Sequence, residues 1–296
     1  MIDTGMSPRV LLVLFTAVAA VSGAGTLVRL APDVHPLVIA FWRTSIVAVM
    51  LSPWLRRMER RDAMLIAIAG LCLAGHFWAW FSSLGRTTVM RSTLLVCLTP
   101  IWAGMAESLL GESRPARFWA GIAVAIAGVV GMAAGGSAGG SARGGASGAS
   151  GAAGDGLALL GGLLGAAYFV TGRDVRRRIG IGAYGAAVCG ATALWLVPAI
   201  VVSGAPVVGF DSHVWTVLIA LALGPQLLGH IGFNYAVGYL PAAVVAAVIL
   251  LEPVGATLIA ASVLKEVPTS REIAGGCAVL LGVAVATAPI PRLRPR

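Results

Sequence analysis

The chain has 296 residues, of which 58% are hydrophobic and only 11% charged, and its mean hydropathy is +0.91. This composition excludes an ordinary water-soluble domain, which needs a larger polar surface, and it indicates a membrane protein. The net charge of +9 does not indicate a nucleic-acid partner, because the arginines stand in short clusters between apolar runs.

Apolar stretches of about 18 to 25 residues recur along nearly the whole chain, and each can cross a hydrocarbon core of ~30 Å as a helix. They predict an all-α integral membrane protein with ten transmembrane helices. In chain order we expect helices over residues 10–30, 37–55, 64–84, 90–110, 117–134, 156–172, 182–203, 214–238, 241–264 and 271–290. The cysteines lie inside these stretches without metal-binding spacing, so we expect no metal and no cofactor.

A segment without hydrophobic pattern divides the chain. Residues 135–154 consist only of Gly, Ser and Ala, apart from Arg143, and such a composition cannot bury a core. We therefore predict a first five-helix unit over 1–134, a linker over 135–155 and a second five-helix unit over 156–296.

The distribution of basic residues predicts the orientation. With the N-terminus on one side, 14 of the 21 Lys and Arg residues fall on that side, six fall on the other, and Arg43 lies within a helix. Because basic loops near helix ends stay in the cytoplasm, both termini are predicted to be cytoplasmic and the linker external. The expected location is the plasma membrane.

The two units share a series of residues in the same order. An offset of 154 residues pairs Gly75-His76 with Gly229-His230, Glu112 with Glu266, Gly121 with Gly275 and Gly128 with Gly282, and an offset of 153 pairs Pro100 with Pro253. Since each unit has an odd number of helices, the second unit must enter the membrane from the opposite side. The pattern predicts two inverted repeats, an arrangement typical of secondary transporters.

Several short motifs carry a resemblance to a known family. They are Leu98-Thr99-Pro100 through Leu110-Gly111-Glu112 and Leu251-Glu252-Pro253-Val254 through Leu264-Lys265-Glu266, each followed by two of the paired glycines, together with Arg43. With these motifs the chain resembles the EamA-type branch of the drug/metabolite transporter superfamily, although Lys265 stands where a Gly is usual. The resemblance implies a ten-helix fold with cytoplasmic termini and the export of amino acids or other small metabolites.

Polar side chains at membrane depth are costly and are therefore candidates for function. His76 and Trp80 share one helical face, and Gln226, His230 and Asn234 recur every four residues. We predict that the two faces meet across a central cavity, where the histidines bind a carboxylate or relay a proton. The alternative is a hydrogen bond that only joins helices. Trp102 is a further candidate for stacking on a substrate.

Two charged residues are candidates for coupling. Glu252 lies inside a predicted helix directly before Pro253, and Arg43 is its expected counter-ion, in a pair that either switches between access states or permanently holds the bundle. Glu107 is expected to be hydrated or paired with Arg114.

Prolines and glycines predict bends and close packing. Pro100 and Pro253 occupy matched positions and Pro225 precedes a polar stripe, so all three are candidate hinges. Gly161 and Gly165 form a GxxxG spacing that permits close helix approach, either within the fold or in a homodimer.

The leading functional hypothesis is a secondary transporter, most naturally an exporter, of an amino acid or related metabolite by alternating access. The chain has no Walker A motif for ATP hydrolysis. An intramembrane enzyme is the first alternative, although no HExxH motif is present. A membrane subunit or sensor without transport activity is the second. The expected partners are a small-molecule substrate and the lipid bilayer, with no nucleic acid.

Overall fold

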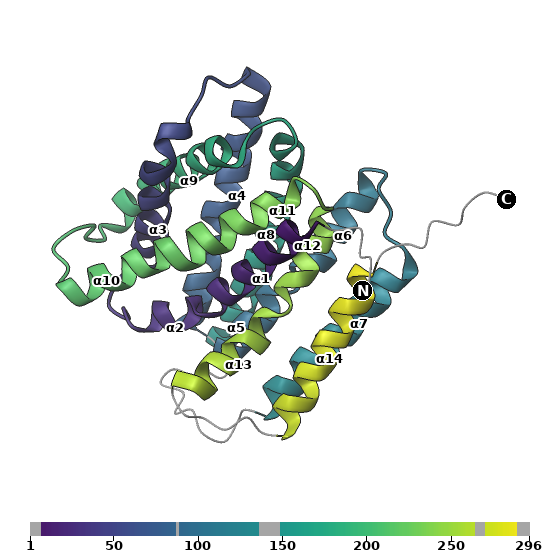
Figure 1. Ribbon diagram of the computed structural model, residues 1–296. Coiled ribbons are helices and arrows are strands. Elements are labelled where there is room, and N and C mark those ends of the chain that lie inside the picture. Colours follow the sequence, from purple (N-terminus) through teal and green to yellow (C-terminus); the bar gives the residue numbers. More distant parts are fainter. Residues whose placement is uncertain (1–6, 87–88, 136–148, 264–269, 289–296) are drawn as a thin grey trace.

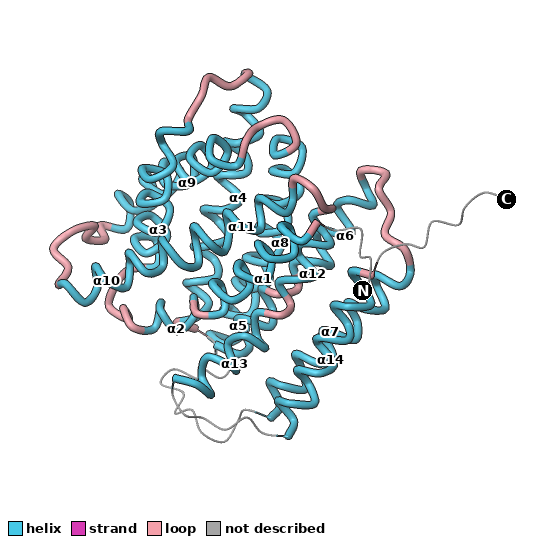
Figure 2. The backbone as a smooth tube through the Cα atoms, in the orientation of Figure 1, coloured by secondary structure: helices cyan, strands magenta, loops and turns pink. Residues whose placement is uncertain are grey.

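The computed structural model describes residues 7–86, 89–135, 149–263 and 270–288, and within these ranges every regular element is a helix and none is a strand (Figures 1 and 2). The elements are α1 (Pro8–Ser22), α2 (Ala24–Arg29), α3 (Pro36–Leu51), η1 (Ser52–Trp54), α4 (Arg60–Leu84), α5 (Val89–Val96), α6 (Thr99–Leu109), α7 (Ala116–Gly135), α8 (Ala149–Arg176), α9 (Ile181–Ser203), α10 (Ser212–Leu221), η2 (Ala222–His230), α11 (Ile231–Val237), α12 (Ala242–Ile249), α13 (Glu252–Val263) and α14 (Ser270–Thr287).

The predicted all-α membrane class agrees with these helices, whereas the number of ten spans is not established by them. Within the described residues, six helical units are long and apolar enough to cross a membrane. They cover Pro8–Val28, Pro36–Trp54, Arg60–Leu84, Gly151–Arg176, Ile181–Ser203 and Ser212–Val237. The shorter apolar helices are Ala116–Gly131, Ala242–Ala256 and Ile273–Thr287.

Local sequence signals explain where helices begin and end. The Ser7 side chain accepts a hydrogen bond from the Val10 amide and Pro8 occupies the first turn, so α1 begins with a cap and a residue that needs no amide partner. The Asp211 carboxylate caps α10 in the same way, through the Val214 amide at 2.8 Å. Helix α9 ends at Gly204, whose φ of 64° suits glycine.

Three predicted helices lose regular α-geometry at a proline. Helix α5 ends at Val96, α12 at Ile249 and α10 at Leu221, and each of these residues lies four positions before Pro100, Pro253 and Pro225, respectively. A proline has no amide for the carbonyl four residues earlier, and its ring crowds that carbonyl. The chain therefore breaks twice into two short helices and once continues as the π-helical segment η2.

The core is packed mainly through helix pairs from different parts of the sequence. Helices α4 and α8 pack closely, and Gly161 and Gly165 of α8 face His76 and Trp80 of α4. Of the two interpretations of this GxxxG spacing, the structure therefore shows packing within the fold.

Helices α7 and α14 form a separate pair at one edge of the molecule (Figure 1). A Cβ added to Gly121 would lie 2.5 Å from the Gly282 carbonyl oxygen, and one added to Gly128 would lie 2.6 Å from the Gly275 carbonyl oxygen. The sequence positions rise in one helix while they fall in the other, so the pair is antiparallel and glycine allows its close approach.

The predicted linker over 135–155 is shorter in the structure. Gly135 is the last residue of α7, and α8 already begins at Ala149, because the alanines before Asp155 favour helix despite their glycine neighbours. Residues 136–148 lie outside the described part of the chain, and so does Glu266.

Candidate functional site

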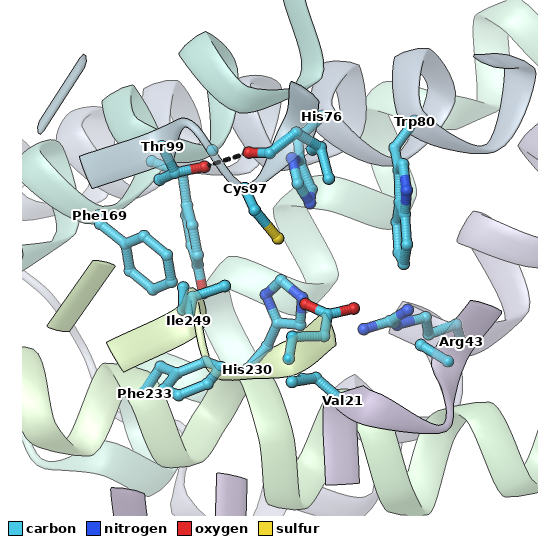
Figure 3. A pocket seen from close by; sticks show the side chains of 15 residues that line it. Val21, Arg43, His76, Trp80, Cys97, Thr99, Phe169, His230, Phe233 and Ile249 are labelled. Carbon is cyan, nitrogen blue, oxygen red and sulfur yellow. Dashed lines mark hydrogen bonds between the residues drawn. The ribbon is translucent and has the colours of Figure 1, made fainter. Parts of the chain in front are cut away.

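A small cavity lies in the middle of the bundle, where α1, α3, α4, α8, η2 and the two helix breaks meet. Figure 3 shows His76 and Trp80 pointing into it from α4, opposite His230, while Arg43 enters from the side. Its volume of about 40 Å³ holds roughly two or three water molecules, whereas ligand pockets usually exceed ~300 Å³. The protein is therefore closed around this site.

Arg43 is completely buried and only partly bonded. Its Nε donates to the Gln226 side-chain oxygen at 2.8 Å, and its guanidinium carbon lies 4.3 Å from the centre of the Phe77 ring. Both terminal guanidinium nitrogens are buried without a hydrogen-bond partner. An arginine in this state offers two parallel N–H groups to a planar anion.

The two histidines lie close together but differ in their bonding. Their ring centres are 5.9 Å apart. The His76 Nδ1 lies 2.8 Å from the Gly161 carbonyl oxygen, so it must donate, and Nε2 is the ring nitrogen left for the cavity. The His230 Nδ1 has no partner, and neither does the Trp80 indole nitrogen. The cavity therefore contains several polar atoms without protein partners.

Glu252 supplies the acidic side chain of the cavity. It is the first residue of α13, directly after the helix break, and not the middle of a continuous helix as the sequence suggested. Its side chain lines the same cavity as the Arg43 side chain. The Glu252 backbone oxygen accepts a hydrogen bond from the Ser22 hydroxyl at 3.3 Å, which joins α13 to α1.

Some predicted site residues do not line this cavity. Gln226 holds Arg43 and approaches the Cys189 sulfur, while Asn234 bonds to the Tyr168 hydroxyl and to the His230 carbonyl. The α-helical spacing of four placed them on one face with His230, but the π-helical turns of η2 change the register between Gln226 and His230, and the Asn234 side chain, in α11, is bound by Tyr168 and the His230 carbonyl. Trp102 is half-buried and also lies outside the cavity lining.

The three prolines also lie outside the lining. Pro100 and Pro253 are the second residues of α6 and α13 and directly follow the lining residues Thr99 and Glu252, and Pro225 lies inside η2. The Thr99 hydroxyl donates to the Val96 carbonyl at 2.7 Å, which is the carbonyl that Pro100 leaves without an amide.

Sequence reasoning missed part of the lining. Tyr168, Phe169 and Phe233 close the cavity with aromatic rings, and Cys97 and Thr99 line it at the first helix break. The break itself was the available signal, because residues next to the paired prolines must face the point where the helices separate.

A second group of charges lies at the end of the bundle where α6 and α8 end. It consists of Glu107, Glu112, Arg114 and Arg173, and we call it the charge cluster. Glu107 is fully buried. It accepts hydrogen bonds from Arg173 at 2.9 Å and from the Ala242 and Ala243 amides at 2.7 and 3.3 Å.

Of the two alternatives expected for Glu107, hydration or pairing with Arg114, the structure shows the pair, at 3.4 Å, with Glu107 buried. The stronger partner, Arg173, comes from the other half of the chain, so sequence distance concealed it. Glu112 pairs with Arg173, whose hydrogen bond and charge hold the pKa of this carboxyl below its ordinary value. The cluster thereby joins α6 and its following loop to α8 and α12.

Comparison with known proteins identifies the family. The family model described as "EamA-like transporter family" matches residues 8–134 and 152–288, one match in each half. No curated protein matches the sequence. A solved structure described only as "Crystal structure of protein" has a TM-score of 0.76 and 21% identity, over 95% of this chain and 97% of that chain, and it supports the fold alone. The family matches cover most of the sequence. The chain is therefore a multi-pass membrane transporter that belongs to the EamA-like transporter family of the drug/metabolite transporter superfamily.

Proposed function

We propose that this protein is a secondary transporter that carries a small metabolite with a carboxylate group, such as an amino acid or a related compound, by alternating access around the central cavity. The observation that carries the proposal is the pair of unbonded terminal nitrogens on buried Arg43. A buried donor without a partner costs about 1–3 kcal/mol, more when it is charged, and a bound carboxylate would supply both missing bonds.

The remaining groups suit the other parts of such a substrate. Glu252 can attract an ammonium group, and the aromatic rings around the cavity suit an apolar side chain. His76 and His230 can accept or donate hydrogen bonds between these two ends. A zwitterion would thus leave no net charge unpaired in the closed cavity.

The small volume of the cavity requires that the bundle open to admit a substrate. The two broken helices supply natural points of bending, because Pro100 and Pro253 remove backbone hydrogen bonds beside the cavity. In this mechanism the charge cluster closes the end to which it belongs. Opening there would separate α12 from Glu107 and Arg173 from its carboxylate partners.

Support for inverted repeats comes from α7 and α14. Gly121 approaches Gly282 and Gly128 approaches Gly275, whereas the repeat offset equates Gly121 with Gly275 and Gly128 with Gly282. Such a reciprocal pairing is what a two-fold axis between equivalent helices produces. An axis in the membrane plane would relate two five-helix units of opposite orientation.

We further propose a total of ten spans in the plasma membrane. Both termini would lie in the cytoplasm, because 14 of the 21 basic residues fall on the side of the termini. The charge cluster then lies at the cytoplasmic end. The direction of net transport is proposed to be outward, driven by gradients.

The test begins with a metabolite comparison between cells that overexpress the protein and cells that lack it. Compounds that accumulate outside the first cells are then loaded into proteoliposomes, and their flux is measured with wild-type protein and with the Arg43→Lys variant. Flux of a carboxylate compound that the variant slows supports the proposal. Equal flux in both proteins, or flux only of compounds without a carboxylate, contradicts it.

A further inference from the structure

A second, larger hollow opens on the outside of the helix bundle. It lies between α1, the broken pair α12 and α13, and α14, and its volume is about 500 Å³. Its walls carry large apolar side chains that remain exposed, among them Phe15 at 75%, Leu258 at 63% and Leu280 at 53%. We call this hollow the lateral groove.

The polar atoms along the lateral groove already have partners. The Ser22 hydroxyl donates to the Val18 carbonyl at 2.8 Å as well as to the Glu252 carbonyl, and the Thr287 hydroxyl donates to the Val283 carbonyl at 2.7 Å. Among the described residues that line the groove, none has a titratable side chain. Its occupant therefore needs no hydrogen bonds from the protein and must be apolar.

The dimensions of the groove limit the occupant further. Along α1 the groove runs from Leu11 to Ser22, which is ~16 Å at ~1.5 Å per residue and about half of a ~30 Å hydrocarbon core. This length matches the hydrocarbon thickness of one leaflet, and therefore an acyl chain that enters from one side of the bilayer.

We propose that the lateral groove binds one acyl chain of a phospholipid from the leaflet on the side of the N-terminus. Arg9 is exposed two residues before the first groove residue of α1, where the phosphate of such a lipid would lie. The positive charge of Arg9 would thus face the negative phosphate at the mouth of the groove, and the apolar walls of the groove would contact the acyl chain along its length.

The acyl chain would contact the outer side of a wall that also bounds the central cavity. Val21 and Glu252 face the cavity, and their neighbours Ser22 and Gly255 face the groove. The bond from Ser22 to the Glu252 carbonyl closes this wall. A lipid in the groove would therefore support the position of α13 directly behind Glu252.

The test uses the full chain with the photo-crosslinking amino acid benzoylphenylalanine in place of Phe15, in the groove, or Leu194, which is 73% exposed on α9 outside the groove. Both proteins are solubilised in detergent, washed free of loosely held lipid and irradiated, and their intact masses are measured by mass spectrometry. The proposal predicts a phospholipid adduct on the protein with the crosslinker at position 15 and no adduct on the protein with the crosslinker at position 194.

A second change distinguishes a specific site from residual lipid. Ala19→Trp places an indole in the groove, and Ala199→Trp makes the same change at an exposed position of α9. Ala19→Trp should lower the yield of the adduct at position 15 at least several-fold, and Ala199→Trp should leave this yield unchanged. Both variants should elute as folded protein in gel filtration. An adduct that survives Ala19→Trp, equal adducts at both positions, no adduct at position 15, or a covalent dimer through position 15 would each overturn the proposal.

Discussion

Two buried polar regions of the described chain, the charge cluster and the central cavity, differ in how completely their polar atoms are bonded. In the charge cluster, both carboxylate oxygens of Glu107 have partners, namely two arginines and two backbone amides, and Arg173 keeps only its Nε without a hydrogen-bond partner. In the central cavity, Arg43, Trp80 and His230 each keep buried polar atoms without a protein partner. Unsatisfied buried groups lower stability, whereas satisfied groups fix one arrangement of helices. The contrast assigns stability to the cluster and ligand binding to the cavity, and the two assignments can be separated by mutation.

The largest effect is expected from Glu107→Gln. The substituted amide would direct N–H groups at the Ala243 amide or Arg114, and Arg173 would lose its buried counter-charge, so the free energy of unfolding should fall by about 3–5 kcal/mol. Denaturant unfolding of purified protein in detergent measures this loss. The double variant Glu107→Gln/Arg173→Gln should recover part of it. A loss below about 1 kcal/mol would show that the cluster does not hold the helices together.

Arg43→Lys is expected to give the second largest effect, on transport and not on stability. Lysine keeps the positive charge but loses the paired N–H groups, so substrate flux should fall about tenfold to a hundredfold, or ~1.4–2.7 kcal/mol. The midpoint of thermal unfolding should change by only a few degrees. A variant with normal flux and a strongly lowered midpoint would instead place Arg43 with the structural residues.

The two histidines allow a matched comparison of smaller effects. His230→Phe removes a nitrogen that has no partner, whereas His76→Phe removes one that donates to the Gly161 carbonyl. We expect His76→Phe to cost about 1 kcal/mol in unfolding free energy and His230→Phe to cost nothing or to stabilise. Both should slow flux several-fold. The opposite order of stabilities would contradict the bonding that distinguishes the two rings.

Much of the fold could be predicted from the sequence because it depends on local patterns. Apolar length predicted where helices lie, whereas the paired prolines were predicted as hinges within continuous helices and the structure has a break beside each. Pro198, by contrast, lies inside α9 without ending it. Whether a proline interrupts a helix depends on the neighbours that can satisfy the freed carbonyl, and these neighbours are not local in sequence.

The site was predicted only in part, for a similar reason. Arg43, His76, Trp80, His230 and Glu252 are polar or aromatic groups at membrane depth, and the structure places all five around one cavity. Gln226 was assigned to the face of His230 by α-helical spacing, which the π-helical segment changes, whereas Asn234 in α11 is held outside the lining by its bond to Tyr168. The pairing of Glu107 with Arg173 joins residues 66 positions apart, and no periodic pattern connects them.

The smallest effect is expected at the outer part of the charge cluster. The Glu112 side chain is 41% exposed, so its pair with Arg173 should contribute no more than about 1 kcal/mol. Arg173 lowers the folded-state pKa of Glu112 below the ordinary value of 4.5. The stabilisation is therefore complete above pH 4.5 and is lost as the pH falls through the lowered pKa. The free energies of unfolding of the wild-type protein and of Glu112→Gln should be compared from pH 7 to pH 3. They should differ slightly at pH 7, and the difference should disappear in acid. A difference as large as that of Glu107→Gln would mean that exposure does not weaken this pair, and the distinction between the buried and the exposed carboxylate of the cluster would fail.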